Sequence, residues 1–90
     1  MKNRSRLDEL LAGLAAIVSK KRKELGLTQE DLAQATGLHR TYISDIERGK
    51  RNITLGVLYV LGEALNLSAI DLLSKAEEYE TVSLYRKAAQ

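Results

Sequence analysis

The stretch TQEDLAQATGLHRTYISDIERG, residues 28–49, decides the fold of this chain. It predicts two short helices joined by a turn at Gly37, because glycine adopts a left-handed backbone conformation without steric cost. The apolar residues that face inward on these two helices are Leu32, Ala33, Leu38, Ile43 and Ile46. Their spacing gives each helix one buried face and one exposed face.

The outer face of the second helix is polar. Its residues are His39, Arg40, Thr41, Ser44 and Arg48. A helix that follows a three-residue turn and crosses its predecessor forms the helix-turn-helix arrangement, in which the second helix enters the major groove of DNA. Residues 28–49 therefore predict a DNA-binding unit.

Five helices are expected along the whole chain. Three begin at a hydroxyl side chain flanked by apolar residues that pair across the first turn, namely Thr28, Thr54 and Ser68. Helix ends are expected at residues that adopt the left-handed conformation, namely Gly26, Gly37, Gly49 and Asn66. The predicted helices span about residues 5–25, 29–36, 39–48, 55–65 and 69 onward. No strand pattern competes, so the fold class is all-α, a compact five-helix domain.

The ninety residues contain no linker and no internal repeat, which predicts one domain over residues 1–90 with its core at about residues 7–74. The first helix has an apolar stripe made of Leu7, Leu10, Leu11, Leu14, Ile17, Val18 and Leu25. The helix over 55–65 is apolar on nearly all sides, so we expect it at the centre or at a contact between subunits. Residues 75–90 form an extension that either continues an amphipathic helix or frays.

The composition excludes several classes of protein. The chain has no cysteine, which rules out disulfides and thiolate metal sites. The absence of cysteine is compatible with a reducing cytosol. It has one histidine, no phosphate-cradling glycine motif and no nucleophile set, so we expect no enzyme, no metal and no cofactor. No apolar run approaches the roughly 20 residues of a membrane span. Asp8 and Glu9 interrupt any signal peptide, and we expect a cytoplasmic, nucleoid-associated protein with no membrane partner.

The charge is distributed unevenly. The net charge is only +2, but residues 1–27 carry seven Lys or Arg against three acids, and residues 54–90 carry three against five. This asymmetry favours a polyanionic partner on one face. The run KKRK at residues 20–23 is equally typical of a solvated helix end, where cations suit the helix dipole.

Arg40 and Thr41 are the leading candidates for contacts with DNA bases. A guanidinium reaches both acceptors of guanine, and threonine offers a hydroxyl together with a methyl group that can touch thymine. Ser44 lies one turn further along the same face. Tyr42 either packs at the edge of the core or reaches DNA with its hydroxyl. His39 flanks the start of the helix.

Phosphate contacts are expected at the two ends of the unit, from Gln29, Arg48, Lys50, Arg51 and Asn52. Arg51 and Asn52 have an alternative role, which is to order the turn before Thr54. Arg22 and Glu47 fall near the inner edges of their helices, so we expect them to form a structural ion pair that leaves neither charge unpaired.

From about Ile17 to Leu73 the chain resembles the lambda-repressor and Cro-like (XRE) helix-turn-helix regulators, with KRKELGLTQEDLAQATGL and YISDIERGKRNITL as the matching core. The string GLHRTYISDIERGKRNITL is especially similar to the controller proteins of restriction-modification systems, which are small dimeric regulators. The resemblance implies a homodimer that binds double-stranded DNA at a pseudo-palindromic operator without a cofactor. It also implies that Gln29 binds phosphate and braces the first turn of the helix over 39–48, and that Arg22 and Glu47 link two helices.

The two ends of the chain extend past a typical controller protein. An alternative hypothesis therefore makes the chain an antitoxin or adaptor, whose C-terminal tail binds a protein partner and whose DNA contact serves autoregulation.

Overall fold

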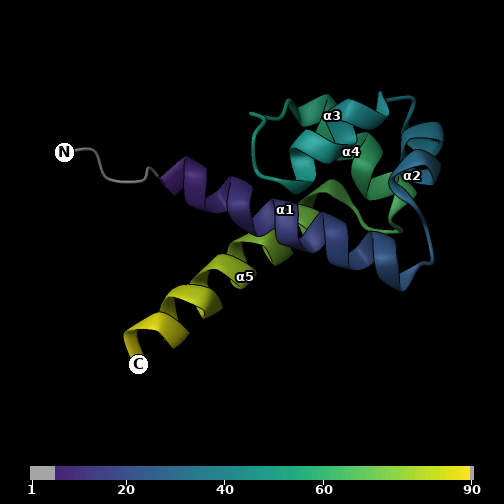
Figure 1. Cartoon of the computed structure of the whole chain (residues 1–90). Helices are drawn as coiled ribbons and strands as arrows, with labels where there is room; N and C mark the ends of the chain where they lie inside the picture. The colour runs from purple at the N-terminus through teal and green to yellow at the C-terminus, as the bar shows by residue number, and fades with distance from the viewer. Residues whose placement is uncertain (1–5, 90) are drawn as a thin grey trace.

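The computed structural model describes residues 6–89, within which there are five helices and no strand. They are α1 (Arg6–Glu24), α2 (Gln29–Thr36), α3 (Arg40–Glu47), α4 (Leu55–Ala64) and α5 (Ala69–Ala89). Helices α2, α3 and α4 gather on one side of α1, and the C-terminal end of α5 projects away from them (Figure 1). The predicted all-α, five-helix fold is confirmed.

Side-chain caps set the starts of three helices. Thr28 Oγ1 accepts a hydrogen bond from the Asp31 backbone N–H at 3.0 Å, and the Asp31 carboxylate accepts one from the Thr28 N–H at 2.9 Å. This reciprocal capping box satisfies two N–H groups that an α-helix leaves without partners. Thr54 and Ser68 cap α4 and α5 with a single hydrogen bond each. All three predicted helix starts are therefore confirmed.

The turn between α2 and α3 is held by its own hydrogen bonds. Gly37 has a φ of 76°, and its N–H donates to the carbonyl oxygen of Ala33 at 2.9 Å. Thr36 Oγ1 donates to Leu32 O at 2.8 Å and accepts from the Leu38 N–H at 3.2 Å. These bonds fix the direction in which the chain leaves α2. The other predicted left-handed residues also have positive φ: Gly26, Gly49 and Asn66.

All five helices contribute to one core. Its fully buried large side chains are Val18, Leu32, Ile43, Ile46, Leu61, Leu65 and Leu72. The predicted stripe of α1 is buried only in its middle, since Leu7 and Leu25 lie at its two ends and are exposed. Only one face of α4 enters the core. Leu58 and Leu61 are buried, whereas Leu55 is 77% exposed and Tyr59 is 57% exposed.

Helix α5 packs on α1 at backbone contact. A Cβ at Gly13 would lie 2.2 Å from the carbonyl oxygen of Ala76, so only glycine allows this approach. The helix continues past Ser74 to Ala89 and therefore takes the helical alternative for the extension. No single helix within residues 6–89 is long and apolar enough to cross a membrane; α4 and the first half of α5 pass that test only as a pair bent by 94°.

Candidate nucleic-acid interface

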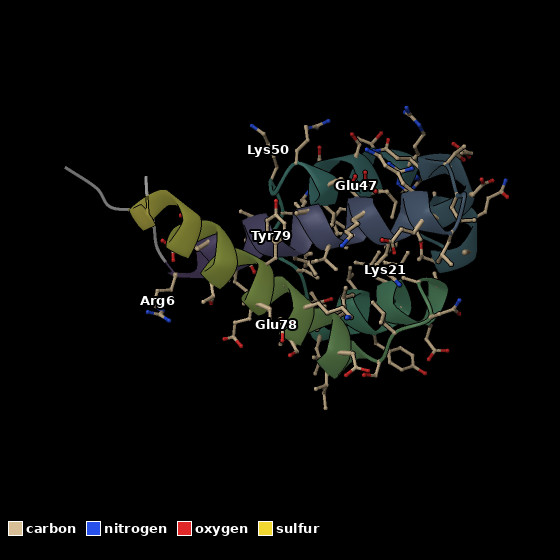
Figure 2. The ribbon with its side chains drawn as sticks, turned by 90° about the horizontal axis from the view of Figure 1, so that it is seen from below. Arg6, Lys21, Glu47, Lys50, Glu78 and Tyr79 are labelled. Atoms are coloured by element: carbon tan, nitrogen blue, oxygen red, sulfur yellow. The ribbon has the colours of Figure 1, made fainter. Side chains whose placement is uncertain are left out.

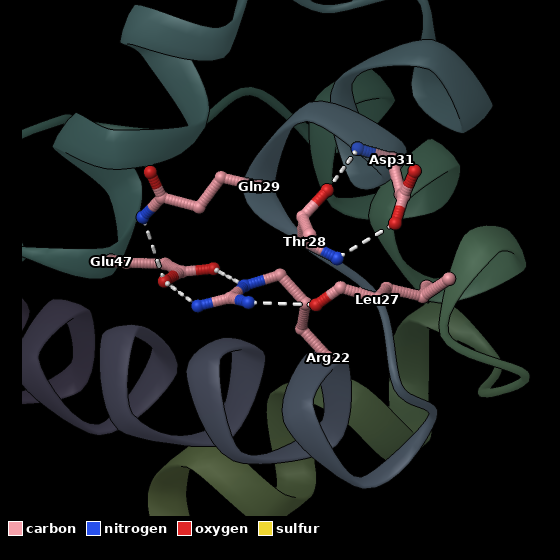
Figure 3. A network of polar contacts seen from close by, with 6 residues as sticks. All are labelled: Arg22, Leu27, Thr28, Gln29, Asp31 and Glu47. Carbon is pink, nitrogen blue, oxygen red and sulfur yellow. Dashed lines mark hydrogen bonds and ion pairs between the residues drawn. The ribbon is translucent and has the colours of Figure 1, made fainter.

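A buried ion pair holds α3 against α1. Arg22 Nε donates to Glu47 Oε2 at 2.7 Å, and Arg22 Nη2 donates to Glu47 Oε1 at 3.0 Å. The third guanidinium nitrogen donates to the carbonyl oxygen of Leu27 at 2.8 Å, and Gln29 Nε2 donates to Glu47 Oε1 at 3.1 Å (Figure 3). The structure thus brings the predicted pair together. Gln29 joins the same network at the last residue of α3, and not at the first turn of α3 as predicted, because Glu47 offers it a carboxylate acceptor.

Burial and hydrogen bonding act in opposite directions on Glu47, whose side chain is 6% exposed. Burial works to raise the pKa of Glu47, but the hydrogen bonds from Arg22 and Gln29 outweigh it, and the pKa lies below its usual value. The same hydrogen bond raises the pKa of Arg22. Both groups therefore stay charged, and the network acts as a fixed brace among α1, α2 and α3.

Acid is expected to weaken the fold through Glu47. A carboxyl whose pKa is lowered in the folded state contributes stability above its usual pKa of about 4.3 and loses it as the pH falls through the lower, folded value. We expect the difference in unfolding free energy between wild type and Glu47→Gln to shrink from about pH 6 to about pH 3. Urea unfolding at each pH measures it, and a constant difference contradicts this account.

The first turn of α3 is presented to solvent. His39 is the N-cap residue, and its side chain makes no capping hydrogen bond. Arg40 and Thr41 follow it and are both exposed, with no side-chain hydrogen bond or ion pair to any other residue in the described range. On the opposite face, Ile43 and Ile46 are buried in the core. The two leading candidates for base contact are therefore free to meet a ligand.

Five residues of α3 and the loop after it are in contact around Asp45, and we call them the Asp45 cluster: Tyr42, Ser44, Asp45, Arg48 and Arg51. Arg48 donates to Ser44 Oγ at 2.7 Å and to one Asp45 carboxylate oxygen. Arg51 Nε donates to the other Asp45 oxygen at 3.2 Å, and its guanidinium carbon lies 4.9 Å from the centre of the Tyr42 ring. Tyr42 also packs against the core, so the core-edge alternative describes its ring.

Asp45 is the residue of this cluster that the sequence interpretation missed. The available signal was its spacing, three residues before Arg48 and six before Arg51, which places an acid within reach of both cations. Because Arg51 bonds to Asp45, it does help to order the loop between α3 and α4, as one of its two predicted roles requires.

The remaining candidates for phosphate contact differ in exposure and in whether their side chains already form hydrogen bonds. Lys50 and Asn52 are exposed in the loop after α3, and neither side chain bonds to another part of the chain that the structure describes. Lys50 points away from the molecule on the side opposite to Glu78 of α5 (Figure 2). Gln29 is half-buried, and its bond to Glu47 leaves one amide hydrogen for a phosphate, together with the backbone N–H groups of Gln29 and Glu30, which the capping box does not use.

The arrangement suits the binding of a polyanion rather than catalysis. Exposed cations follow α3 and its loop, namely Arg40, Arg48, Lys50 and Arg51. Lysine and arginine side chains supply the affinity for phosphates, while polar groups at the start of a recognition helix contact base edges. Among the side chains that the structure describes, those of residues 6–79 and 81, no three of the metal-ligating types lie close enough together to hold a metal ion.

Comparisons with known proteins match this geometry. A helix-turn-helix family model matches residues 18–72. The control protein C.SmaI of Serratia marcescens is 48% identical over 62 residues, which cover 69% of this chain and 74% of that protein. The clp gene regulator ClgR of Corynebacterium glutamicum aligns over 89% of this chain and 85% of its own, with a TM-score of 0.83 and 26% identity.

A third similar protein is the restriction-modification controller protein C.Esp1396I, whose crystal structure holds a tetramer in complex with its natural 35-base-pair operator. It aligns over 87% of this chain and 99% of its own, with a TM-score of 0.73 and 36% identity. The matched proteins are regulators and control proteins rather than enzymes. The chain therefore belongs to the helix-turn-helix family of sequence-specific DNA-binding transcriptional regulators, with control proteins of restriction-modification systems among its relatives.

Proposed function

We propose that the chain regulates transcription as a controller protein, binding a pseudo-palindromic operator as a homodimer. The exposed first turn of α3 carries the proposal, because Arg40 and Thr41 have no partner there within the described residues, and this end of a recognition helix meets base edges. Residues 1–90 act as one domain in this proposal, and binding to the chromosome places the protein at the nucleoid. The relatives reported above are named as regulators, and they lend no support to the antitoxin alternative.

Each predicted site residue has a role in this complex. Contacts with bases come from Arg40, Thr41, Tyr42 and Ser44. Contacts with phosphates come from Gln29, Arg48, Lys50, Arg51 and Asn52. The brace between Arg22 and Glu47 keeps α3 at a constant angle to α1 and α2, so that all of these side chains approach one face of the duplex together.

Exposed apolar side chains support the homodimer. They lie on the consecutive helices α4 and α5 and are Leu55, Tyr59, Ile70 and Leu73. Two copies that meet through these side chains about a two-fold axis remove them from water and present two α3 helices symmetrically. The related C.Esp1396I binds its operator as a tetramer, which shows that a similar chain assembles on DNA.

The test of the function is selection of bound duplexes from a random-sequence library, followed by footprinting. We expect two inverted half-sites whose centres lie about 10 base pairs, or roughly 34 Å, apart. A site upstream of the protein's own gene supports feedback control. If repeated selection enriches no common sequence, the proposal is wrong.

Two alanine variants separate contacts with bases from contacts with phosphates. We expect Arg40→Ala to weaken binding to the selected duplex by about 1 to 3 kcal/mol and to leave binding to a random duplex nearly unchanged. Lys50→Ala is expected to weaken both alike and to reduce the slope of log affinity against log salt by about 0.9. Fluorescence anisotropy titrations of each variant with both duplexes, at several salt concentrations, measure these affinities and slopes. Equal losses for Arg40→Ala on the two duplexes remove Arg40 as a base contact.

A charge placed on the apolar surface tests the homodimer. Ile70 is 79% exposed, so Ile70→Glu costs the single chain little, but in a dimer contact it buries an unpaired carboxylate. We expect the variant to sediment as a monomer at concentrations where wild type is a dimer, and to lose most of its operator affinity. Leu25→Glu, at an exposed position in the turn just after α1, is the control and is expected to remain dimeric. If the Ile70→Glu variant remains dimeric, the subunits do not meet through this apolar surface.

A further inference from the structure

The Asp45 carboxylate bonds to two arginines that both belong to the proposed phosphate contacts. Arg51 uses its Nε for this bond, so both of its terminal nitrogens stay free to donate. The Arg51 side chain is 50% exposed and that of Arg48 is 55% exposed, whereas that of Asp45 is only 19% exposed. The carboxylate is therefore less accessible to solvent than the two arginine side chains that it holds.

The ring of Tyr42 holds Arg51 from a second direction. The guanidinium lies 4.9 Å from the ring centre, within the range of a cation–π contact. Tyr42 itself packs against the core, so it offers a fixed surface rather than a mobile one. An arginine bonded at Nε and covered on one face retains little rotational freedom, and its free edge points in one direction.

We propose that Asp45 is a positioning residue for DNA recognition: it orients Arg51, and with Ser44 it orients Arg48, before DNA arrives, and it does not contact the DNA itself. The proposal rests on the proposed function and adds how the two arginines are ordered before DNA binds. A long side chain ordered in advance loses less conformational entropy on binding, which corresponds to about threefold to tenfold in affinity.

Removing the charge of Asp45 distinguishes this role from a simple electrostatic one. A carboxylate close to phosphates repels them, so charge alone predicts that Asp45→Asn binds every duplex more tightly. Positioning predicts weaker binding to the selected duplex, because a docked complex needs both arginines in fixed places. Non-specific complexes make looser contacts and gain from the lost negative charge. The two accounts therefore predict opposite signs for the selected duplex.

The experiment measures the affinities of wild type, Asp45→Asn and Glu63→Gln for the duplex selected by wild type and for a random duplex. Glu63 is exposed on α4 and bonds to no arginine within the described residues, so Glu63→Gln removes the same charge without touching the Asp45 cluster. We expect Asp45→Asn to bind the selected duplex about threefold to tenfold more weakly, and the random duplex as well as wild type or better. Glu63→Gln is expected to change both affinities alike.

An unchanged ratio between the two duplexes for Asp45→Asn, or tighter binding to the selected duplex, overturns the proposal while leaving the proposed function intact. Failure of wild type to select any duplex overturns the function instead. Loss of the fold is checked by thermal unfolding, which should change little because exposed ion pairs contribute only about 0–1 kcal/mol.

A double-mutant cycle shows whether Asp45 acts through Arg51. We expect Arg51→Ala to reduce affinity for the selected duplex less in the Asp45→Asn background than in wild type, because the arginine is already disordered there. In the free protein, NMR relaxation of the Arg51 Nε–H group is expected to show greater mobility in Asp45→Asn. Additive losses together with unchanged mobility contradict a positioning role.

Discussion

Glu47→Ala is expected to reduce the free energy of unfolding by about 3 to 5 kcal/mol, because it removes one partner of a buried ion pair. The side chains of Arg22 and Glu47 are 11% and 6% exposed, and the variant leaves the guanidinium with only the carbonyl oxygen of Leu27. Gln29 loses its acceptor at the same time. Urea unfolding at neutral pH and fixed protein concentration measures the loss.

Two further variants show whether burial is the cause. The pair between Lys21 and Glu24 is solvent-exposed, with its charged atoms 3.6 Å apart, so Glu24→Ala is expected to cost less than about 1 kcal/mol. The double variant Arg22→Met with Glu47→Leu is expected to recover most of the stability, since it leaves no unpaired charge. If Glu47→Ala costs no more than Glu24→Ala, the buried brace does not stabilise the fold.

Gly13→Val is expected to cost about 3 kcal/mol of unfolding free energy. An added Cβ would lie 2.2 Å from the carbonyl oxygen of Ala76 and 3.1 Å from its carbonyl carbon, and these are backbone atoms that no rotamer change can move. Helices α1 and α5 must separate to make room, and the buried side chains of Val18 and Leu72 then lose contacts. Urea unfolding measures the cost.

Gly56→Val is the matched control for this prediction. Gly56 also lies in a helix, but it is exposed, and the nearest atom to an added Cβ is Thr54 Oγ1 at 3.9 Å. Its stability is expected to stay within about 0.5 kcal/mol of wild type. Glycine is a poorer helix former than valine, so helix propensity does not explain a loss at Gly13. Similar losses at both positions contradict the contact between α1 and α5 as the cause.

The sequence predicted those features that depend on neighbours along the chain. The caps at Thr28 and Thr54 and the left-handed turn at Gly37 each involve residues within four positions, and the structure has them where expected. The helix over 39–48 is shorter than predicted by one residue at each end, because His39 and Arg48 serve as its caps. Such local interactions have the same geometry in almost any fold.

The sequence predicted the kind of site but not its internal contacts. Exposure of Arg40 and Thr41 follows from the apolar stripe on the opposite side of α3, which is a local pattern. The role of Asp45 was missed, because the bond to Arg51 depends on how the loop after α3 turns back.

By itself the sequence determined five helices, the caps of three of them and a basic, polar face on the helix after Gly37, because hydrophobic periodicity and backbone preferences act over one or two turns. The tertiary structure alone decided which distant residues meet. It brought Gly13 against Ala76, ended the core short of Leu7 and Leu25, and set the Tyr42 ring beneath Arg51. These contacts arise from the packing of whole helices, whose relative positions depend on all side chains of the core together.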